Sequence, residues 1–185
     1  MKPVKIFVEG KTGAHSTDSA FLRDCIYHWF GKKIDSKNGF FYIGGADELK
    51  IRAGFFGIEQ LHSEILLIID ADTNPEARKK EIEEFQSANG LKFPYFLFPD
   101  NIHGGEVENL LVEIATNKPK MDCYVAYEKC IDRKLDIKDK IFAYVRAVTG
   151  SKESAKDQNR GFINEHFDLN HPSLQPLKKF LEPYF

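Results

Sequence analysis

The fold of this chain is decided by one stretch of sequence, Glu64-Ile-Leu-Leu-Ile-Ile-Asp70-Ala-Asp72-Thr-Asn-Pro75. Its run of consecutive apolar residues is typical of a strand that is buried on both faces, as in a parallel sheet. Two carboxylates follow at the carboxyl end of this strand, where open α/β sheets bind their ligands. Asn74 and Pro75 then provide an N-cap and a first helical residue. The stretch therefore predicts that Asp70 and Asp72 lie in a turn between a buried strand and a helix.

The same alternation of strand and helix extends over the N-terminal half of the chain. Hydrophobic periodicity predicts strands over 4–8, 40–43, 65–69 and 95–98, and helices over 19–29, 47–56 and 75–89. Such alternation implies parallel strands joined by right-handed crossovers. We therefore predict a Rossmann-like three-layer α/β/α fold with a mainly parallel sheet of about four strands. Glu9 can meet Asp70 only if the first and third strands are neighbours, and this arrangement creates a switch point between them.

Beyond residue 100 the pattern becomes helical. A helix should open near 103–108 and end near Ala115, because Pro119 disfavours a helical conformation at Lys118. Further helices are predicted over 124–131, 137–148 and 174–185. Neither a linker nor a repeat separates the two parts. We expect a single domain over 1–185, with an α/β core at 1–115 and a helical C-terminal extension at 116–185 packed on it.

The amino-acid composition limits the classes of protein to which this chain can belong. The 185 residues are 42% hydrophobic, and 26 basic against 28 acidic residues give a formal net charge of −2. This balance neither predicts nor excludes a nucleic-acid partner, because a local basic patch can lie within a neutral total. No apolar run is long enough to span a membrane, and no signal peptide is visible. Three widely spaced cysteines, Cys25, Cys123 and Cys130, fit no metal motif or disulfide framework, so we expect a cytoplasmic protein.

Acidic residues at the predicted strand ends are the main functional candidates. Glu9 follows the first strand, and Asp70 and Asp72 follow the third. Their mutual repulsion is costly unless a cation neutralises it, and Mg²⁺ prefers carboxylate oxygens. The alternative is that Asp70 and Asp72 cap the next helix while Glu9 is a solvated loop residue. A second acidic pair, Glu106 and Glu108, either completes the site or simply favours the start of a helix.

Weaker candidates surround these acids. His103, beside two glycines, is able to contact a phosphate, and the glycine pair Gly44 and Gly45 lets backbone amides approach an anion. A solvated histidine and a tight turn explain the same residues. Several basic residues are candidate contacts for a nucleic-acid backbone, or form a hydrated face: Lys140, Arg146, Lys152, Lys156 and Arg160.

Taken together, these motifs resemble the Toprim domain of topoisomerases, bacterial primases and overcoming-lysogenization-defect nucleases. The resemblance is carried by Val8-Glu9-Gly10-Lys11, Gly44-Gly45 and Ile69-Asp70-Ala71-Asp72. A later signature, Phe98-Pro99-Asp100-Asn101 followed by Gly105-Glu106-Val107-Glu108-Asn109-Leu110-Leu111, is similar to a Toprim-like family of small prokaryotic proteins. The similarity extends through the helical tail, so it covers nearly the whole chain and implies a Toprim fold.

The resemblance implies a Mg²⁺- or Mn²⁺-dependent phosphoryl-transfer site. Glu9 would be a general acid/base or a metal ligand, Asp70 and Asp72 would be catalytic metal ligands, and Glu108 would join them. Substrate contacts would come from Lys11, Gly44, Gly45 and His103. Toprim relatives often carry an acid soon after the Glu-Gly pair. In this chain a polar loop delays Asp18, and the sequence leaves open whether Asp18 belongs to the site.

The predicted function is a metal-dependent nuclease that acts on DNA or RNA. The chain lacks the further domains of a topoisomerase or a primase, so a small nuclease, or the nuclease of a phage-defence system with a separate ATPase partner, suits its length. The alternative is a non-catalytic Toprim-like module that docks on an ATPase or on nucleic acid. Saturable binding of magnesium or manganese distinguishes the two hypotheses.

Overall fold

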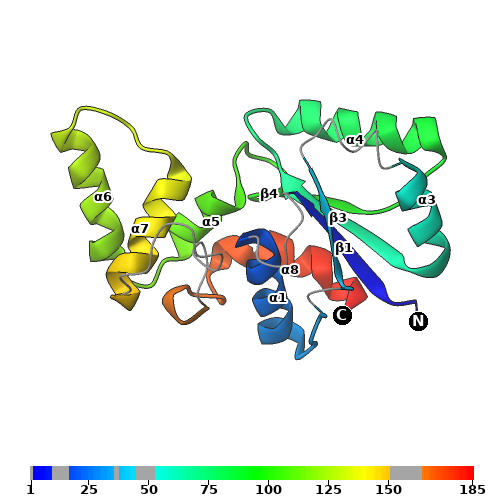
Figure 1. The fold of residues 1–185 in the computed structure, drawn as a ribbon, viewed down its shortest axis with the longest axis horizontal. Coiled ribbons are helices and arrows are strands. Elements are labelled where there is room, and N and C mark those ends of the chain that lie inside the picture. The colour runs from blue at the N-terminus through cyan, green and yellow to red at the C-terminus, as the bar shows by residue number, and fades with distance from the viewer. Residues whose placement is uncertain (1, 10–16, 36–37, 45–52, 151–163) are drawn as a thin grey trace.

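The structure, a computed structural model, describes residues 2–9, 17–35, 38–44, 53–150 and 164–185 (Figure 1). Within these ranges the chain forms an α/β fold around one sheet of four parallel strands. The strands are β1 (Val4–Glu9), β2 (Phe40–Ile43), β3 (Glu64–Asp70) and β4 (Tyr95–Phe98). The predicted fold class and the predicted positions of the strands are confirmed.

The strand order is β2-β1-β3-β4, so the first and third strands are neighbours as expected. Glu9 at the end of β1 pairs in register with Ile43 of β2, and Val8 pairs with Ile68 of β3. After β2 the chain crosses back over β1 to form β3, so the direction of winding reverses beside β1. The carboxyl ends of β1 and β3 therefore flank a topological switch point, the place where such sheets bind ligands.

Helices cover both faces of the sheet and produce three layers (Figure 1). The apolar cluster on one face includes α1, α5 and α8, and the cluster on the other face includes α3 and α4. The α-helices of the described part of the chain are α1 (Thr17–Phe30), α3 (Ala53–His62), α4 (Pro75–Asn89), α5 (Val107–Ile114), α6 (Lys118–Cys130), α7 (Ile137–Thr149) and α8 (Gln175–Leu181). Short 3₁₀ turns occupy Asn164–His166, Pro172–Leu174 and Glu182–Tyr184.

The apolar side chains of β3 pack on both faces of the sheet, because successive side chains of a strand point to opposite faces. Leu66 and Ile68 join the cluster beneath α1 and α5, whereas Leu67 and Ile69 join the one beneath α3 and α4. All four side chains are almost completely buried. This double burial explains why the strand reads as a continuous apolar run rather than as an alternating one.

The C-terminal part of the chain packs on the first of these faces. Leu177 and Leu181 of α8 are fully buried in the same cluster as the sheet, and Phe180 lies 5.4 Å from Phe96 of β4 between ring centroids. Tyr144 of α7 belongs to this cluster too. Figure 1 shows α8 beneath the sheet beside α1, with α6 and α7 further from the sheet on the side of α5.

Three predicted helix boundaries were wrong, including the end of the helix predicted over 47–56, since α3 continues to His62. Helix α6 begins at Lys118 rather than at 124, because Pro119 lies in its first turn, where proline is tolerated, and Asn117 caps it by accepting a hydrogen bond from the Lys120 amide at 3.2 Å. The helix predicted over 174–185 is interrupted, with 3₁₀ turns on either side of α8.

Other expectations are borne out, or fall partly outside the described residues. The predicted end near Ala115 is confirmed, and Gly90 ends α4 in the left-handed conformation. Of the helix predicted over 47–56, residues 47–52 lie outside the described ranges, and α3 follows at 53–62. None of the described helices is both long and apolar enough to cross a membrane, and all three cysteines are free.

Candidate functional site

Acidic side chains from four separate elements lie together at the switch point. Glu9 ends β1 and Asp70 ends β3, while Asp18 and Glu108 lie in the first turns of α1 and α5. The charges of Glu9, Asp18 and Glu108 each raise the pKa of Asp70, so these groups are close enough to repel one another. We call these four residues the acidic cluster. Asp18, whose place the sequence left open, lies close enough to Asp70 to raise its pKa.

Burial and repulsion both oppose ionisation within the acidic cluster. Burial first, and then the charges of its neighbours, raise the pKa of Asp70 to about 9 and that of Asp18 to about 7. Burial is also the main reason that the pKa values of Glu9 and Glu108 are raised. A buried group of carboxyls is stable only where protons or cations compensate its charge. The acidic cluster therefore has the electrostatic character of a cation site.

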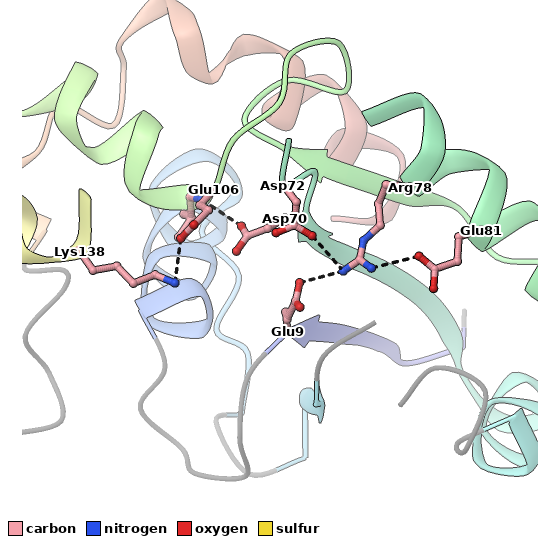
Figure 2. A network of polar contacts seen from close by, with 8 residues as sticks. Glu9, Asp70, Asp72, Arg78, Glu81, Glu106 and Lys138 are labelled. Carbon is pink, nitrogen blue, oxygen red and sulfur yellow. Dashed lines mark hydrogen bonds and ion pairs between the residues drawn. The ribbon is translucent and has the colours of Figure 1, made fainter. Parts of the chain in front are cut away.

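The loop before α5 holds Asp70 in place. The Val107 amide donates a hydrogen bond to Asp70 Oδ1 at 3.0 Å (Figure 2), and the Ala71 amide donates to the Gly105 carbonyl at 3.1 Å. The start of α5 is itself fixed, because the Glu106 amide donates to Asn109 Oδ1 at 2.7 Å. The acidic residues before and within α5 thus have the helix-start role that the sequence allowed, and they also face the end of β3.

Arg78 of α4 is the principal partner of the acids on one side of the site. Figure 2 shows its guanidinium between Glu9, Asp72 and Glu81, at nitrogen–oxygen distances of 3.2, 3.9 and 3.2 Å. The Arg78 side chain is only 6% exposed. The sequence analysis did not select it. The available signal was a basic residue in the first turn of the helix that follows the Asp-x-Asp pair.

Lys138 brings a second cation from the helical extension. It lies near the start of α7, and its Nζ is 2.8 Å from Glu106 Oε2 (Figure 2). Burial lowers the pKa of Lys138, but the hydrogen bond to Glu106 and the charges of Glu108 and Asp70 outweigh it and raise the pKa overall. Lys140, which the sequence offered as a contact for a nucleic-acid backbone, pairs with Glu128 at 2.9 Å. The extension therefore contributes to the site through a residue that the sequence did not indicate.

The remaining candidates are placed less centrally or are not described. Asp72 has a side chain that is 61% exposed; it lies 3.9 Å from Arg78, and its charge raises the pKa of Glu9. His103 is exposed, with its Nδ1 2.7 Å from Asp100 Oδ2, so its described partner is not the acidic cluster. Gly44 directly follows β2, beside the end of β1. Lys11 and Gly45 lie outside the described residues, as do Lys152, Lys156 and Arg160.

The donor set fits a hard divalent cation in its chemistry, although it is not preorganised. Among the described residues, no three acidic, histidine or cysteine side chains converge closely enough to hold an ion as they stand. Glu108, however, is only 5% exposed, and its Oε2 has no hydrogen-bond partner in the described part of the chain. Carboxylate oxygens are the ligands that Mg²⁺ prefers, and few are needed. The orphaned oxygen of Glu108 and the chemistry of these donors are therefore what fit a divalent ion.

Comparisons with known proteins add no further information about this site. No protein-family model, no curated protein and no solved structure matches the chain. The resemblance to Toprim proteins stays a prediction from the quoted motifs. Support for a function comes instead from the acidic cluster and its two cationic neighbours.

Proposed function

We propose that this protein is a metal-dependent phosphodiesterase that cleaves DNA or RNA. The observation that carries the proposal is the acidic cluster, in which acids from two adjacent strand ends and two helix starts repel one another. One of its oxygens, Oε2 of Glu108, has no hydrogen-bond partner among the described residues. A divalent cation stabilises such a cluster, and the switch point of an open α/β sheet is the place where ligands bind. The Toprim-like motifs point to the same chemistry. An ATPase partner and a role in phage defence remain predictions from that resemblance.

Each residue has a separate part in the proposed reaction. Asp70 and Glu108, together with Asp18, would hold Mg²⁺ or Mn²⁺, and the Val107 amide fixes the orientation of the Asp70 carboxyl. A bound ion would supply positive charge to a phosphoryl oxygen and promote deprotonation of water. Glu9 would accept the proton of the attacking water. Burial raises its pKa while Arg78 opposes the rise, which moves this carboxyl towards the range suited to a general base.

The test is cleavage of labelled single- and double-stranded DNA and RNA by the full chain in Mg²⁺ or Mn²⁺. Asp70→Asn keeps the acceptor for the Val107 amide but removes a charged ligand. It should lower cleavage by at least about 100-fold, because even outer-shell changes at metal sites cost about 10–100-fold. The matched control is Glu84→Gln, which removes an exposed carboxylate of α4 that pairs only with Lys80 among the described residues. Undiminished cleavage by folded Asp70→Asn would contradict the proposal.

One observation favours the second candidate, a binding module without catalytic activity. Arg78 and Lys138 already neutralise part of the acidic charge, and no group among the described residues is preformed for an ion. Titration with Mn²⁺, followed by calorimetry, separates the two functions. Saturable binding at or below millimolar concentration supports the phosphodiesterase, and its absence supports the module.

A further inference from the structure

The acids at the switch point fall into two groups that differ in how their charge is balanced. Glu9 and Asp72 share the guanidinium of Arg78, and we call them the Arg78 half. Asp18, Asp70 and Glu108 have no comparable buried cation among the described residues, and we call them the open half. We propose that the site holds one divalent ion, in the open half, and that Arg78 takes the place that a second ion would occupy. This inference rests on the proposed function and specifies its metal stoichiometry.

Arg78 is held in the Arg78 half by burial and by ion pairs. Its side chain is 6% exposed and makes three ion pairs, and Figure 2 shows the guanidinium enclosed by carboxylates. Arginine keeps its charge at every working pH, so it cannot make room for an ion by losing a proton. An ion that took over Glu9 and Asp72 would leave a buried guanidinium with Glu81 alone. Because unpaired buried charge is strongly unfavourable, the Arg78 half excludes a second ion.

The open half lacks such a fixed partner. Glu108 is buried, and its Oε2 has no hydrogen-bond partner in the described chain. Among the described residues, the cation that acts on Asp18 and Glu108 is Lys138. Its side chain is 48% exposed, and its ammonium is bound to Glu106 at 2.8 Å. A lysine has a flexible stem and is readily solvated, so its head can withdraw into water when an ion binds. The open half is therefore where added positive charge is most strongly favoured.

This arrangement gives Arg78 a defined part in the reaction. Two-metal phosphodiesterases use their ions to stabilise the attacking and the leaving oxygens together. Here the ion would supply one positive charge, and the other would be the Arg78 guanidinium of α4, directed at Glu9 and not at the reacting oxygens. Arg78 contacts Glu9 at 3.2 Å and so acts through that carboxylate, as a positioning residue. In this proposal Glu9 and Asp72, which the sequence predicted as metal ligands, would instead be ligands of Arg78.

The experiment counts Mn²⁺ ions bound to the full chain, by calorimetry and by electron paramagnetic resonance of free Mn²⁺. The wild-type protein should bind one ion, and Arg78→Gln should bind a second, weaker one. Lys79→Gln is the matched control, since it removes a charge from the next residue of α4, whose described partner is Glu76. It should still bind one ion.

Two ions in the wild type, or an unchanged number of ions in folded Arg78→Gln, would overturn the inference but not the proposed phosphodiesterase function. Absence of any bound ion would overturn both.

A second pair of variants tests the inference even if Arg78→Gln does not fold. Asp72→Asn alters an exposed side chain of the Arg78 half. It should leave the Mn²⁺ affinity within about fivefold of the wild type, because an exposed ion pair contributes at most about 1 kcal/mol. Asp70→Asn alters the open half and should abolish saturable binding. Equal loss of the ion in both variants would show that the two halves bind metal jointly and would overturn the inference.

Discussion

Gly104 and Asp72 are in such close contact that a Cβ added to Gly104 would lie 2.7 Å from the carbonyl oxygen of Asp72. The obstructing atoms belong to the backbone, so they cannot turn aside as a side chain would. The same contact joins residues 72 and 105 in an isolated antiparallel bridge. The absence of a side chain at 104 therefore lets the loop before α5 lie against the turn after β3, and this brings the Val107 amide to Asp70.

Gly104→Ala should lower the free energy of unfolding by about 1–3 kcal/mol, the usual cost of overpacking a closed contact. Mn²⁺ binding should weaken as well, because the Val107 amide is displaced from Asp70. Urea denaturation and calorimetry measure the two effects. The control is Gly57→Ala in α3, where a Cβ would meet nothing within 4 Å. That change should stabilise the protein by about 0.5–1 kcal/mol through helix propensity. Equal stability of Gly104→Ala and the wild type would refute the close-contact argument.

Tyr144→Phe tests the junction between the helical extension and the core. The fully buried Tyr144 hydroxyl donates to the His166 carbonyl at 2.9 Å and accepts from the Asn117 amide at 3.0 Å. Phenylalanine fills the same space but leaves the amide without its acceptor, so stability should fall by about 1–3 kcal/mol in thermal or urea unfolding. Tyr127→Phe, at an exposed position of α6, should change stability by less than about 0.5 kcal/mol. Similar small effects in both variants would mean that the buried hydroxyl contributes nothing.

The fold could be predicted to the extent that its signals are local. Strand β4 and helix α4 have the predicted bounds, because an apolar strand and an Asn-Pro cap with a terminal glycine are each encoded within a few residues. The neighbouring positions of β1 and β3 followed from the requirement that Glu9 meet Asp70. Pro119 was misread because proline is compatible with both the end of one helix and the first turn of the next. Only the cap formed by Asn117 distinguishes the two.

The site could be predicted only in part, because its members are brought together by packing. Glu9 and Asp70 were found from their place at strand ends, which is a local signal. Arg78 and Lys138 reach the site from helices whose rotation depends on the buried faces of α4 and α7, so no spacing in the sequence identifies them. Whether Asp18 belongs to the site could not be predicted for the same reason, since its position depends on how α1 packs under the sheet.

Lys138→Met should strengthen Mn²⁺ binding by about two- to fivefold, because the variant removes a partly exposed cation that competes for the same acids. The number of ions should stay at one, in contrast to the gain expected when Arg78 is replaced. Calorimetry at pH 8 gives both quantities. Lys140→Gln removes a charge two residues further along α7, where the partner is Glu128, and should leave the affinity unchanged. Weaker binding in Lys138→Met would indicate that the lysine supports the ion instead of competing with it.

The acidic cluster should make the metal-free protein less stable as the pH rises. Burial and neighbouring charges raise the pKa of Asp70 to about 9, so between about pH 4 and that value the folded protein holds a proton that the unfolded chain has released. Stability therefore falls with increasing pH across this window, and the raised pKa values of Asp18, Glu9 and Glu108 act in the same direction.

Asp70→Asn cannot ionise, so in EDTA it should melt at least about 2 °C above the wild type at pH 8, with a smaller difference at pH 5. Mg²⁺ should raise the wild-type melting temperature most at pH 8, because the ion replaces the missing proton. Asp122→Asn, on the exposed surface of α6, should keep the wild-type slope. A melting temperature of Asp70→Asn below that of the wild type at pH 8 would show that the cluster is not electrostatically strained.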